Sequence, residues 1–237
     1  MPTDRRETAC ILIRRGAAAV VLDAGSGLRR LLAHPGLLDG AESLDILLTH
    51  FHLDHVIGLA YAPALPLMPT IWAPGRWLYE RDSDAILAPL RSPPLSPFGS
   101  DDHGEVRELA DGTQEIAGMA IRVRRQDRHW HPTAGIRVED AIALVTDTGA
   151  DEGSIELADG VSHLLHEAWS TSADAGPERA SDSTAADAGR IAASAHVNRL
   201  TLIHLNPRLA DEAALLADAR THMSETAVGE DGALLVL

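Results

Sequence analysis

A short apolar run that ends in a cluster of histidines constrains the fold of this chain more than any other feature. The run (residues 44–48) is followed at once by the motif His50-x-His52-x-Asp54-His55. It predicts a buried strand, and the motif begins where that strand ends. His50 and His52 are two residues apart, so both imidazoles project to one side, while Asp54 and His55 fall at the next turn. We call residues 49–55 the metal loop.

The side chains of the metal loop are of the types that bind metal ions. Imidazole and carboxylate are the ligands that zinc and related divalent metals prefer. Three histidines and one aspartate within six residues do not fit an ordinary surface or core role, because burying them without a metal leaves several polar groups in need of partners. The metal loop therefore predicts half of a site for two metals, and such sites usually catalyse hydrolysis.

Composition sets limits on size, partners and location. The chain has 237 residues, 45% of them hydrophobic, which is enough to bury a core within one domain. Its 35 acidic and 20 basic residues leave a net charge of −15, which repels polyanions and argues against nucleic acid as a partner. Arg122 and Arg124 are interpreted as part of a solvated strand face. The lone Cys10 excludes an intrachain disulfide. We find no signal segment and no bilayer-spanning run, which predicts a cytoplasmic protein without membrane contact.

Local patterns predict strands that alternate with helices. We expect a strand over 44–49 and helices over 54–61 and 74–88, then a loop over Pro89–His103 that is rich in Pro, Ser and Gly. A long loop of this kind is either a lid or pocket wall, or a plain surface loop. Residues Ala233–Leu237 are expected to form a closing strand.

Several separated segments resemble the metallo-β-lactamase superfamily and, within it, the ribonuclease Z-like branch of phosphodiesterases. The metal loop is similar to the signature of that superfamily. The other similar segments are residues 21–29 (an aspartate-glycine turn), 131–138 (a third histidine), 146–149 (a bridging aspartate), 165–168 (a His-Glu-Ala element) and 202–208 (a last histidine). The resemblance covers about residues 8 to 210. It implies an α/β fold, a four-layer αββα sandwich, formed by one domain over residues 1–237.

The resemblance also implies a ligand set for two divalent metals. The implied ligands are His50, His52 and His131 for the first metal, Asp54, His55 and His204 for the second, and Asp147 as the bridge between them. His129 competes with His131, because it lies two residues earlier on the same side of a strand. His131 is preferred because Pro-Thr-Ala-Gly follows it, as in the family pattern. Zinc is the first expectation for the metals, with manganese or iron as alternatives.

Further roles follow from the resemblance and from the chemistry of the side chains. Asp54 is expected to accept a proton from the attacking water as well as to bind metal. His166 and Glu167 are expected beside the site, where they would donate a proton to the leaving group or orient a ligand imidazole. A purely structural role for this pair is an equal alternative. Asp23 is expected to brace the metal loop rather than to bind metal.

One departure from the branch bears on the substrate. Asp182-Ser183-Thr184 stands where ribonuclease Z-type enzymes have His-Ser-Thr, and we find no basic insertion to grip tRNA. The predicted function is therefore hydrolysis of a small phosphodiester by a metal-bridging hydroxide, and the resemblance also implies a homodimer. Three alternatives stay open: a carbonyl hydrolase of the lactonase or thioesterase type, a tRNA 3′-end endonuclease of the ribonuclease Z type, and a metal-binding protein without activity.

Overall fold

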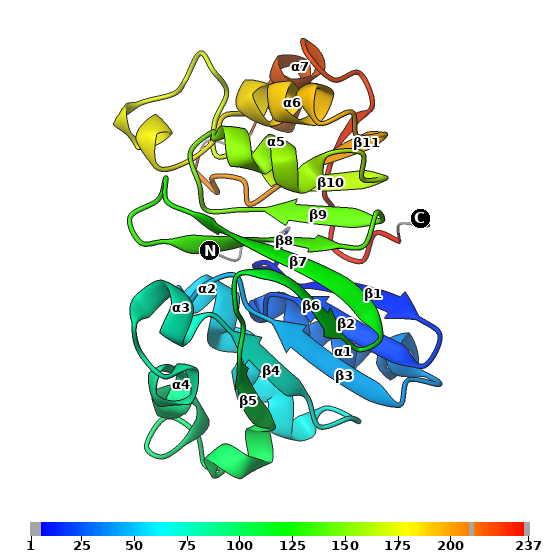
Figure 1. Cartoon of the computed structure of the whole chain (residues 1–237), viewed down its shortest axis with the longest axis vertical. Helices are drawn as coiled ribbons and strands as arrows, with labels where there is room; N and C mark the ends of the chain where they lie inside the picture. The colour runs from blue at the N-terminus through cyan, green and yellow to red at the C-terminus, as the bar shows by residue number, and fades with distance from the viewer. Residues whose placement is uncertain (1–5, 209–210, 235–237) are drawn as a thin grey trace. The chain divides into compact units, whose positions relative to one another are not determined.

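Strands and helices alternate along the chain and build two mixed α/β units. The computed structural model describes residues 6–208 and 211–234, apart from the side chains of residues 178 and 179. Unit 1 runs to Ala110 and includes Glu115–Met119, whereas unit 2 comprises Asp111–Gln114 and the chain from Ala120 onward. Each unit is described by itself (Figure 1). The predicted α/β class with two sheets is confirmed. The prediction of one domain over residues 1–237 stays a prediction.

The sheet of unit 1 carries the strand that was predicted to feed the metal loop. In the described residues its order is β1 (Ile11–Arg15), β2 (Ala18–Leu22), β3 (Ser43–Leu47), β4 (Thr70–Ala73) and β5 (Glu105–Glu108). β1 and β2 are antiparallel, and the other pairs are parallel. Leu22 pairs with Leu47, so the chain leaves β2 and β3 at the same edge of the sheet. This register places Asp23 beside the metal loop.

Short helices pack on the sheet of unit 1. They are η1 (Ser26–Leu28), α1 (Arg29–Ala33), η2 (Pro35–Leu38), α2 (Leu53–Val56), η3 (Ile57–Ala64), α3 (Gly75–Tyr79), α4 (Ser83–Arg91) and η4 (Ser100–His103). Their apolar side chains form one buried cluster with the strands, to which Leu28, Leu59 and Leu87 contribute beside Ile46 and Ile71. Burial of this apolar surface is what holds these short helices in place, since isolated helices of this length are unstable in water.

Two helix predictions in unit 1 need correction. The helix expected over 54–61 is one α-turn followed by a 3₁₀ segment. The helix expected over 74–88 is two helices, because Glu80 adopts a left-handed conformation (φ 53°) and Asp82 starts a new helix by accepting a hydrogen bond from Ala85 N. The predicted loop over Pro89–His103 begins later than expected, since α4 continues to Arg91.

The second sheet lies in unit 2 apart from the β6–β7 turn. Its order in the described residues is β12 (Thr226–Val228), β11 (Arg199–Ile203), β10 (His163–Glu167), β9 (Ile142–Val145), β8 (Thr133–Val138), β7 (Met119–Gln126) and β6 (Gly112–Ile116). β9 to β12 are parallel, and β8 is antiparallel to both β7 and β9. Because the carboxyl ends of parallel strands share one edge, the residues that follow β9, β10 and β11 lie together.

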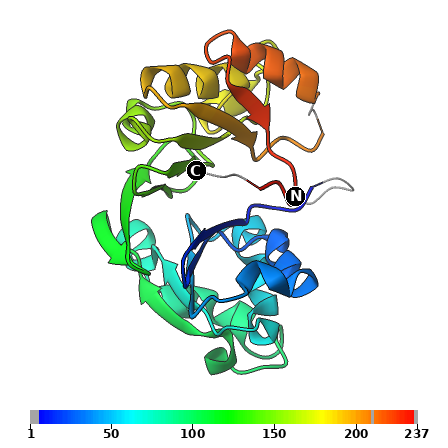
Figure 2. The same cartoon turned by 90° about the vertical axis from the view of Figure 1, so that its right-hand side faces the viewer.

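Three α-helices cover one face of this sheet (Figures 1 and 2). They are α5 (Glu152–Ala158), α6 (Ala185–Ser194) and α7 (Glu212–Arg220), and a 3₁₀ segment, η5 (Pro177–Ala180), precedes α6. Thr184 caps α6 and Asp211 caps α7, as polar residues commonly do at helix starts. Alanines and leucines of these helices form the core with β9, β10 and β11.

Of the predicted closing strand over 233–237, residues 235–237 lie outside the described residues, and the last strand described is β12. None of the helices in the described part of the chain combines the length and the apolar character needed to cross a membrane.

Candidate metal centre

The metal loop of unit 1 gathers its four predicted ligands. His50 and His55 are completely buried. The ring centroid of His50 lies 4.4 Å from the ring centroid of His52 and 4.3 Å from that of His55. Asp54 Oδ2 lies 3.7 Å from His55 Nε2. Three imidazoles and a carboxylate therefore converge within one turn of chain, as the spacing in the sequence predicted.

Asp23 holds the metal loop in place from the end of β2. Its buried carboxylate accepts hydrogen bonds from Thr49 N (2.8 Å), from Thr49 Oγ1 (3.0 Å) and from His55 Nδ1 (2.8 Å). The Thr49 hydroxyl has one proton and donates it to Asp23, so it accepts from His50 Nδ1 at 3.0 Å. In both histidines the basic nitrogen is then Nε2, which is the tautomer that a metal requires. The predicted bracing role of Asp23 is confirmed.

A second cluster of ligands lies at the strand ends of unit 2. We call His129, Asp147, Glu167 and His204 the Asp147 cluster. Asp147 Oδ1 lies 3.7 Å from His129 Nε2, and Asp147 Oδ2 lies 3.6 Å from His204 Nε2. Glu167 Oε2 lies 3.5 Å from His204 Nδ1, and ligand atoms of Asp147, Glu167 and His204 all lie within 4.8 Å of one another.

The backbone is strained at three residues that follow strands and lie in or beside the metal loop and the Asp147 cluster. Asp23, Asp147 and His204 follow the ends of β2, β9 and β11, and all three have positive φ (58°, 51° and 47°). Such conformations cost a non-glycine residue about 1–3 kcal/mol and collect at functional sites. The positive φ values turn the chain at the strand ends, so that Asp23 contacts the metal loop and Asp147 and His204 lie in the Asp147 cluster.

Glu167 organises the Asp147 cluster. Its buried carboxylate accepts hydrogen bonds from the backbone N–H groups of Asp147 (3.0 Å), Thr148 (2.9 Å) and Ser183 (2.9 Å). Complete burial raises the pKa of Glu167, while the N–H donors and His204 favour the charged carboxylate. One side chain thus joins the loop after β9, the start of α6 and the imidazole of His204. The geometry suits the orienting role that the sequence suggested for Glu167.

His166 faces away from the Asp147 cluster. It precedes Glu167 on β10, so the alternation along a strand turns it to the opposite face of the sheet. Its Nδ1 donates to the carbonyl oxygen of Glu167 at 2.8 Å, and its buried Nε2 has no hydrogen-bond partner among the described residues. Burial lowers the pKa of His166 to about 4, so the imidazole is neutral at pH 7. This environment does not support the predicted role of proton donor, and it suits the structural alternative.

The structure places His129, rather than His131, beside Asp147. His129 Nδ1 donates to the carbonyl oxygen of Ser181 at 2.9 Å, which directs its basic Nε2 toward Asp147. Only 9% of the His129 side chain is exposed, whereas His131 is an exposed residue. The ranking of His131 above His129 is therefore not supported. The spacing of two does not separate the histidines, because both lie on the same side of the chain, and the Pro-Thr-Ala-Gly segment after His131 favoured the other residue.

Asp182 lies beside the Asp147 cluster at the position of the missing histidine. Its Oδ1 is 3.7 Å from His129 Nδ1, and its Oδ2 accepts from Ser181 Oγ at 2.8 Å. Burial raises the pKa of Asp182, and the nearby charge of Asp147 raises it further. The carboxylate therefore contacts a candidate metal ligand instead of standing free in the loop.

Some supporting residues were not found from the sequence. Trp169 stacks on His204 with ring centroids 5.4 Å apart, and Thr146 Oγ1 donates to Asp147 Oδ2 at 2.7 Å. Thr49 and Thr146 each directly precede a candidate ligand, which is the one sequence signal that points to them. Trp169 carries no such signal, because it contacts His204 only through the fold.

The donors in each unit fit a divalent metal such as zinc. Imidazoles whose Nδ1 is held by a hydroxyl, a carboxylate or a carbonyl oxygen present Nε2 to a metal, and carboxylates complete the set. Hydrogen bonds to the outer side of the ligands are typical of protein metal sites. His50, His55 and His129 all have this arrangement.

Comparisons with known proteins place the chain in a family. The family model of the metallo-beta-lactamase superfamily matches residues 3–146. The uncharacterized protein ML1173 of Mycobacterium leprae is 30% identical over 208 residues, a match that covers 79% of this chain and 67% of that protein. Ribonuclease Z of Nocardia farcinica is 29% identical, and the match covers 98% of this chain and 92% of that protein. The chain belongs to the metallo-beta-lactamase superfamily.

Solved structures agree on the fold. The metallo-beta-lactamase fold protein YhfI from Bacillus subtilis matches with a TM-score of 0.79 at 19% identity, over 99% of this chain and 94% of that one. A diphosphatase from the PhnP family matches with a TM-score of 0.72 at 17% identity, over 96% of this chain and 83% of that one. The predicted metallo-β-lactamase type of fold is confirmed. Family membership and the His/Asp clusters identify the chain as a metal-dependent hydrolase.

Proposed function

We propose that this protein is a dinuclear metal-dependent phosphodiesterase that acts on a small substrate. The proposed metal ligands are His50, His52, Asp54 and His55 of the metal loop with His129, Asp147 and His204 of the Asp147 cluster. The observation that carries the proposal is the intact donor set in both clusters. We also propose that residues 1–237 form one catalytic domain. His131 is the alternative to His129.

Each donor has a role that its surroundings support. When bound, two divalent metals acidify water and neutralise the charge that develops on a phosphate. Asp54 is 28% exposed at its side chain, so it can accept the proton of the attacking water. Asp147 offers two carboxylate oxygens, with His129 on one side and His204 on the other. Glu167 acts as a positioning residue, because it fixes the backbone of Asp147 and orients His204.

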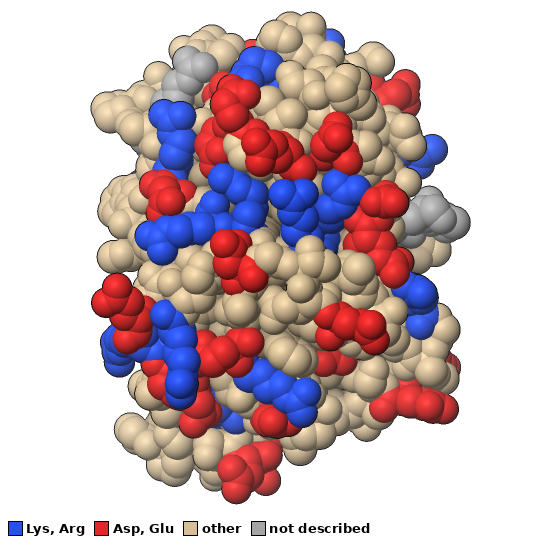
Figure 3. All heavy atoms as spheres, viewed as in Figure 1, with Lys and Arg blue, Asp and Glu red and all other residues tan. Residues whose placement is uncertain are grey.

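The choice of a phosphodiester rests on the relatives, and the choice of a small one rests on charge. Relatives named ribonuclease Z and a structural neighbour named as a diphosphatase both support cleavage at phosphorus. The net charge of −15 opposes a polyanion. On the face shown in Figure 3, a row of basic side chains is bordered by acidic side chains. On β7, Arg122 is exposed as predicted, whereas the Arg124 side chain is only 24% exposed and pairs with Asp151.

A tRNA precursor is the second candidate substrate, because relatives are named ribonuclease Z. A carbonyl substrate, as for a lactonase or thioesterase, is the third, since the same ligands serve either reaction.

Metal analysis combined with a turnover assay tests the proposal. We expect about two equivalents of zinc per chain and hydrolysis of bis-p-nitrophenyl phosphate, both reduced in the Asp147→Ala variant. The control is Asp140→Ala, the same substitution at an aspartate whose side chain is 90% exposed. It should leave the zinc content and the rate of hydrolysis unchanged. Two metals with turnover of a lactone or thioester instead of the diester would move the function to carbonyl hydrolysis. Cleavage of pre-tRNA on a gel would establish the second candidate, and protein that cannot be loaded with metal would refute the ligand assignment.

A further inference from the structure

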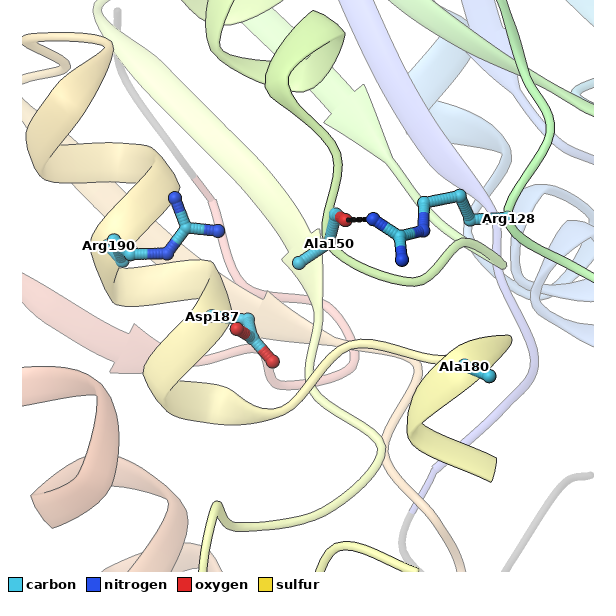
Figure 4. Close-up of a pocket in the computed structure, with 5 residues that line it drawn as sticks. All are labelled: Arg128, Ala150, Ala180, Asp187 and Arg190. Carbon is cyan, nitrogen blue, oxygen red and sulfur yellow. Dashed lines mark hydrogen bonds between the residues drawn. The ribbon is translucent and has the colours of Figure 1, made fainter. Parts of the chain in front are cut away.

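Unit 2 contains a pocket with two arginines that the proposed chemistry does not use. We call it the arginine pocket, and Arg128, Ala150, Ala180, Asp187 and Arg190 line it (Figure 4). Its volume is about 450 Å³, within the range of small-ligand pockets. Figure 4 shows the guanidinium groups of Arg128 and Arg190 directed toward Ala150 from opposite sides. The pocket therefore presents positive charge from two different segments of the chain.

Both guanidinium groups keep hydrogen-bonding capacity for a ligand. Arg128 donates from Nη1 to the carbonyl oxygen of Ala150 at 2.8 Å. Arg190 has Glu152 Oε1 at 3.8 Å from its Nη1, and the Glu152 side chain is 86% exposed, so this ion pair is weak. In contrast, Arg124 holds Asp151 through two hydrogen bonds. A guanidinium carries five N–H donors, so one contact each leaves most of the donors of Arg128 and Arg190 available.

The acidic residue of the arginine pocket is engaged in capping α6. Asp187 Oδ2 accepts from Thr184 Oγ1 at 2.6 Å, and the residue is only 9% exposed. The first backbone N–H groups of α6 are engaged too, since Ala185 N donates to Ser170 O and Ala186 N donates to Asp218. The helix terminus therefore adds no donors here. Among the described lining residues, two are arginines and one is an aspartate, so basic side chains outnumber acidic ones there, on a chain of net charge −15.

The arginine pocket is built on the same loops as the Asp147 cluster. Arg128 directly precedes His129, and Ala150 comes three residues after Asp147. The loop that carries Ala180 also carries Ser181, whose carbonyl oxygen accepts from His129 Nδ1. The arginine pocket and the Asp147 cluster thus share three segments of unit 2, around residues 128–129, 147–150 and 180–181.

We propose that the arginine pocket binds a second phosphate-class anion of the substrate, beside the phosphodiester that is cleaved. The planar donors of arginine match phosphate oxygens in a two-point geometry, which favours this anion class. The inference deepens the proposed function and rests on it. It names the preferred substrate as a small phosphodiester that carries an additional phosphate group.

A matched pair of chromogenic substrates tests the inference. The pair is the p-nitrophenyl ester of thymidine 5′-phosphate with and without a 3′-phosphate. We expect the form with the 3′-phosphate to have the higher kcat/KM. The ratio between the two forms should fall roughly tenfold in Arg190→Gln, a loss typical of one hydrogen bond to a charged group. Arg190→Lys, which keeps the charge, should recover part of it. Arg122→Gln is the control, because it removes the same charge from an exposed arginine of β7 that does not line the pocket.

The outcomes separate this inference from the proposed function. A ratio near one in the wild type, or an equal fall in the control, would overturn the inference and leave the phosphodiesterase intact. If neither ester is hydrolysed, calorimetry with pyrophosphate on the metal-loaded protein replaces the kinetic test. Weaker pyrophosphate binding in Arg190→Gln than in Arg122→Gln then supports an anion site without the phosphodiesterase. Equal binding in both variants refutes the site. Binding of inorganic phosphate as tight as that of the bisphosphate product would instead assign the pocket to a free anion, against our proposal.

Discussion

Asp23→Asn tests whether a residue outside the proposed ligand set controls the metal loop. The carboxylate of Asp23 accepts from Thr49 N and His55 Nδ1, each at 2.8 Å, and both donors are buried. The asparagine oxygen can accept from only one side, so the new NH₂ group faces the Nδ1–H of His55. The imidazole must then move or carry its proton on Nε2, and either change removes the lone pair that would bind a metal.

The magnitudes follow from those contacts. One buried donor left without an acceptor costs about 1–3 kcal/mol of unfolding free energy. Loss of a hydrogen bond that orients a ligand usually weakens metal affinity about 10- to 100-fold. We expect both effects in Asp23→Asn, the first from urea unfolding in the presence of a chelator and the second from zinc competition with a chromogenic chelator.

The control is another buried aspartate of the same unit. Asp45 accepts from Trp72 Nε1 at 2.8 Å, and Asp45→Asn makes the same change away from the metal loop. We expect it to lower stability without weakening zinc binding. The reasoning would be refuted if Asp23→Asn bound zinc as tightly as the wild type, or if Asp45→Asn weakened binding equally.

Three further predictions concern unit 2. His129→Ala should weaken zinc binding at least tenfold while His131→Ala changes it little, as measured by the same chelator competition; the reverse order would restore the ranking from sequence. Burial lowers the pKa of His166 from 6.5 to about 4, so unfolding takes up a proton between these values and stability falls as pH drops from 6.5 toward 4. That loss amounts to about 3 kcal/mol. Without metal, the unfolding free energy of His166→Asn should therefore depend less on pH over this range than that of the wild type, and equal slopes in the two proteins would contradict the prediction. Gly189→Ala should lower the unfolding free energy by about 1–3 kcal/mol, because its Cβ would meet Ala219 O of α7 at 2.3 Å; a higher melting temperature would show that helix propensity dominates.

The sequence by itself determined which types of candidate metal ligand are present and the class of fold. The metal loop is local, so its ligand types and spacing were sufficient to predict that its side chains converge. The sequence placed Asp147 and His204 each after an apolar strand, and in the structure these strands, β9 and β11, flank β10 in parallel, so both residues lie at one edge of the sheet. The sequence also suggested that Asp23 braces the metal loop, and the structure adds the reason, because β2 pairs with the strand that feeds the metal loop.

The tertiary structure alone decided which neighbours work together. His129 and His131 share one side of the chain, and the carbonyl oxygen of Ser181, 52 residues away in sequence, accepts from His129 Nδ1 and so directs Nε2 toward Asp147. His166 and Glu167 are adjacent in sequence, but the strand sends one to the helices and the other to the Asp147 cluster. The arginine pocket joins Arg128 and Arg190 from distant segments. These arrangements depend on register and on loop contacts between segments far apart in the chain, which local patterns of residues do not encode.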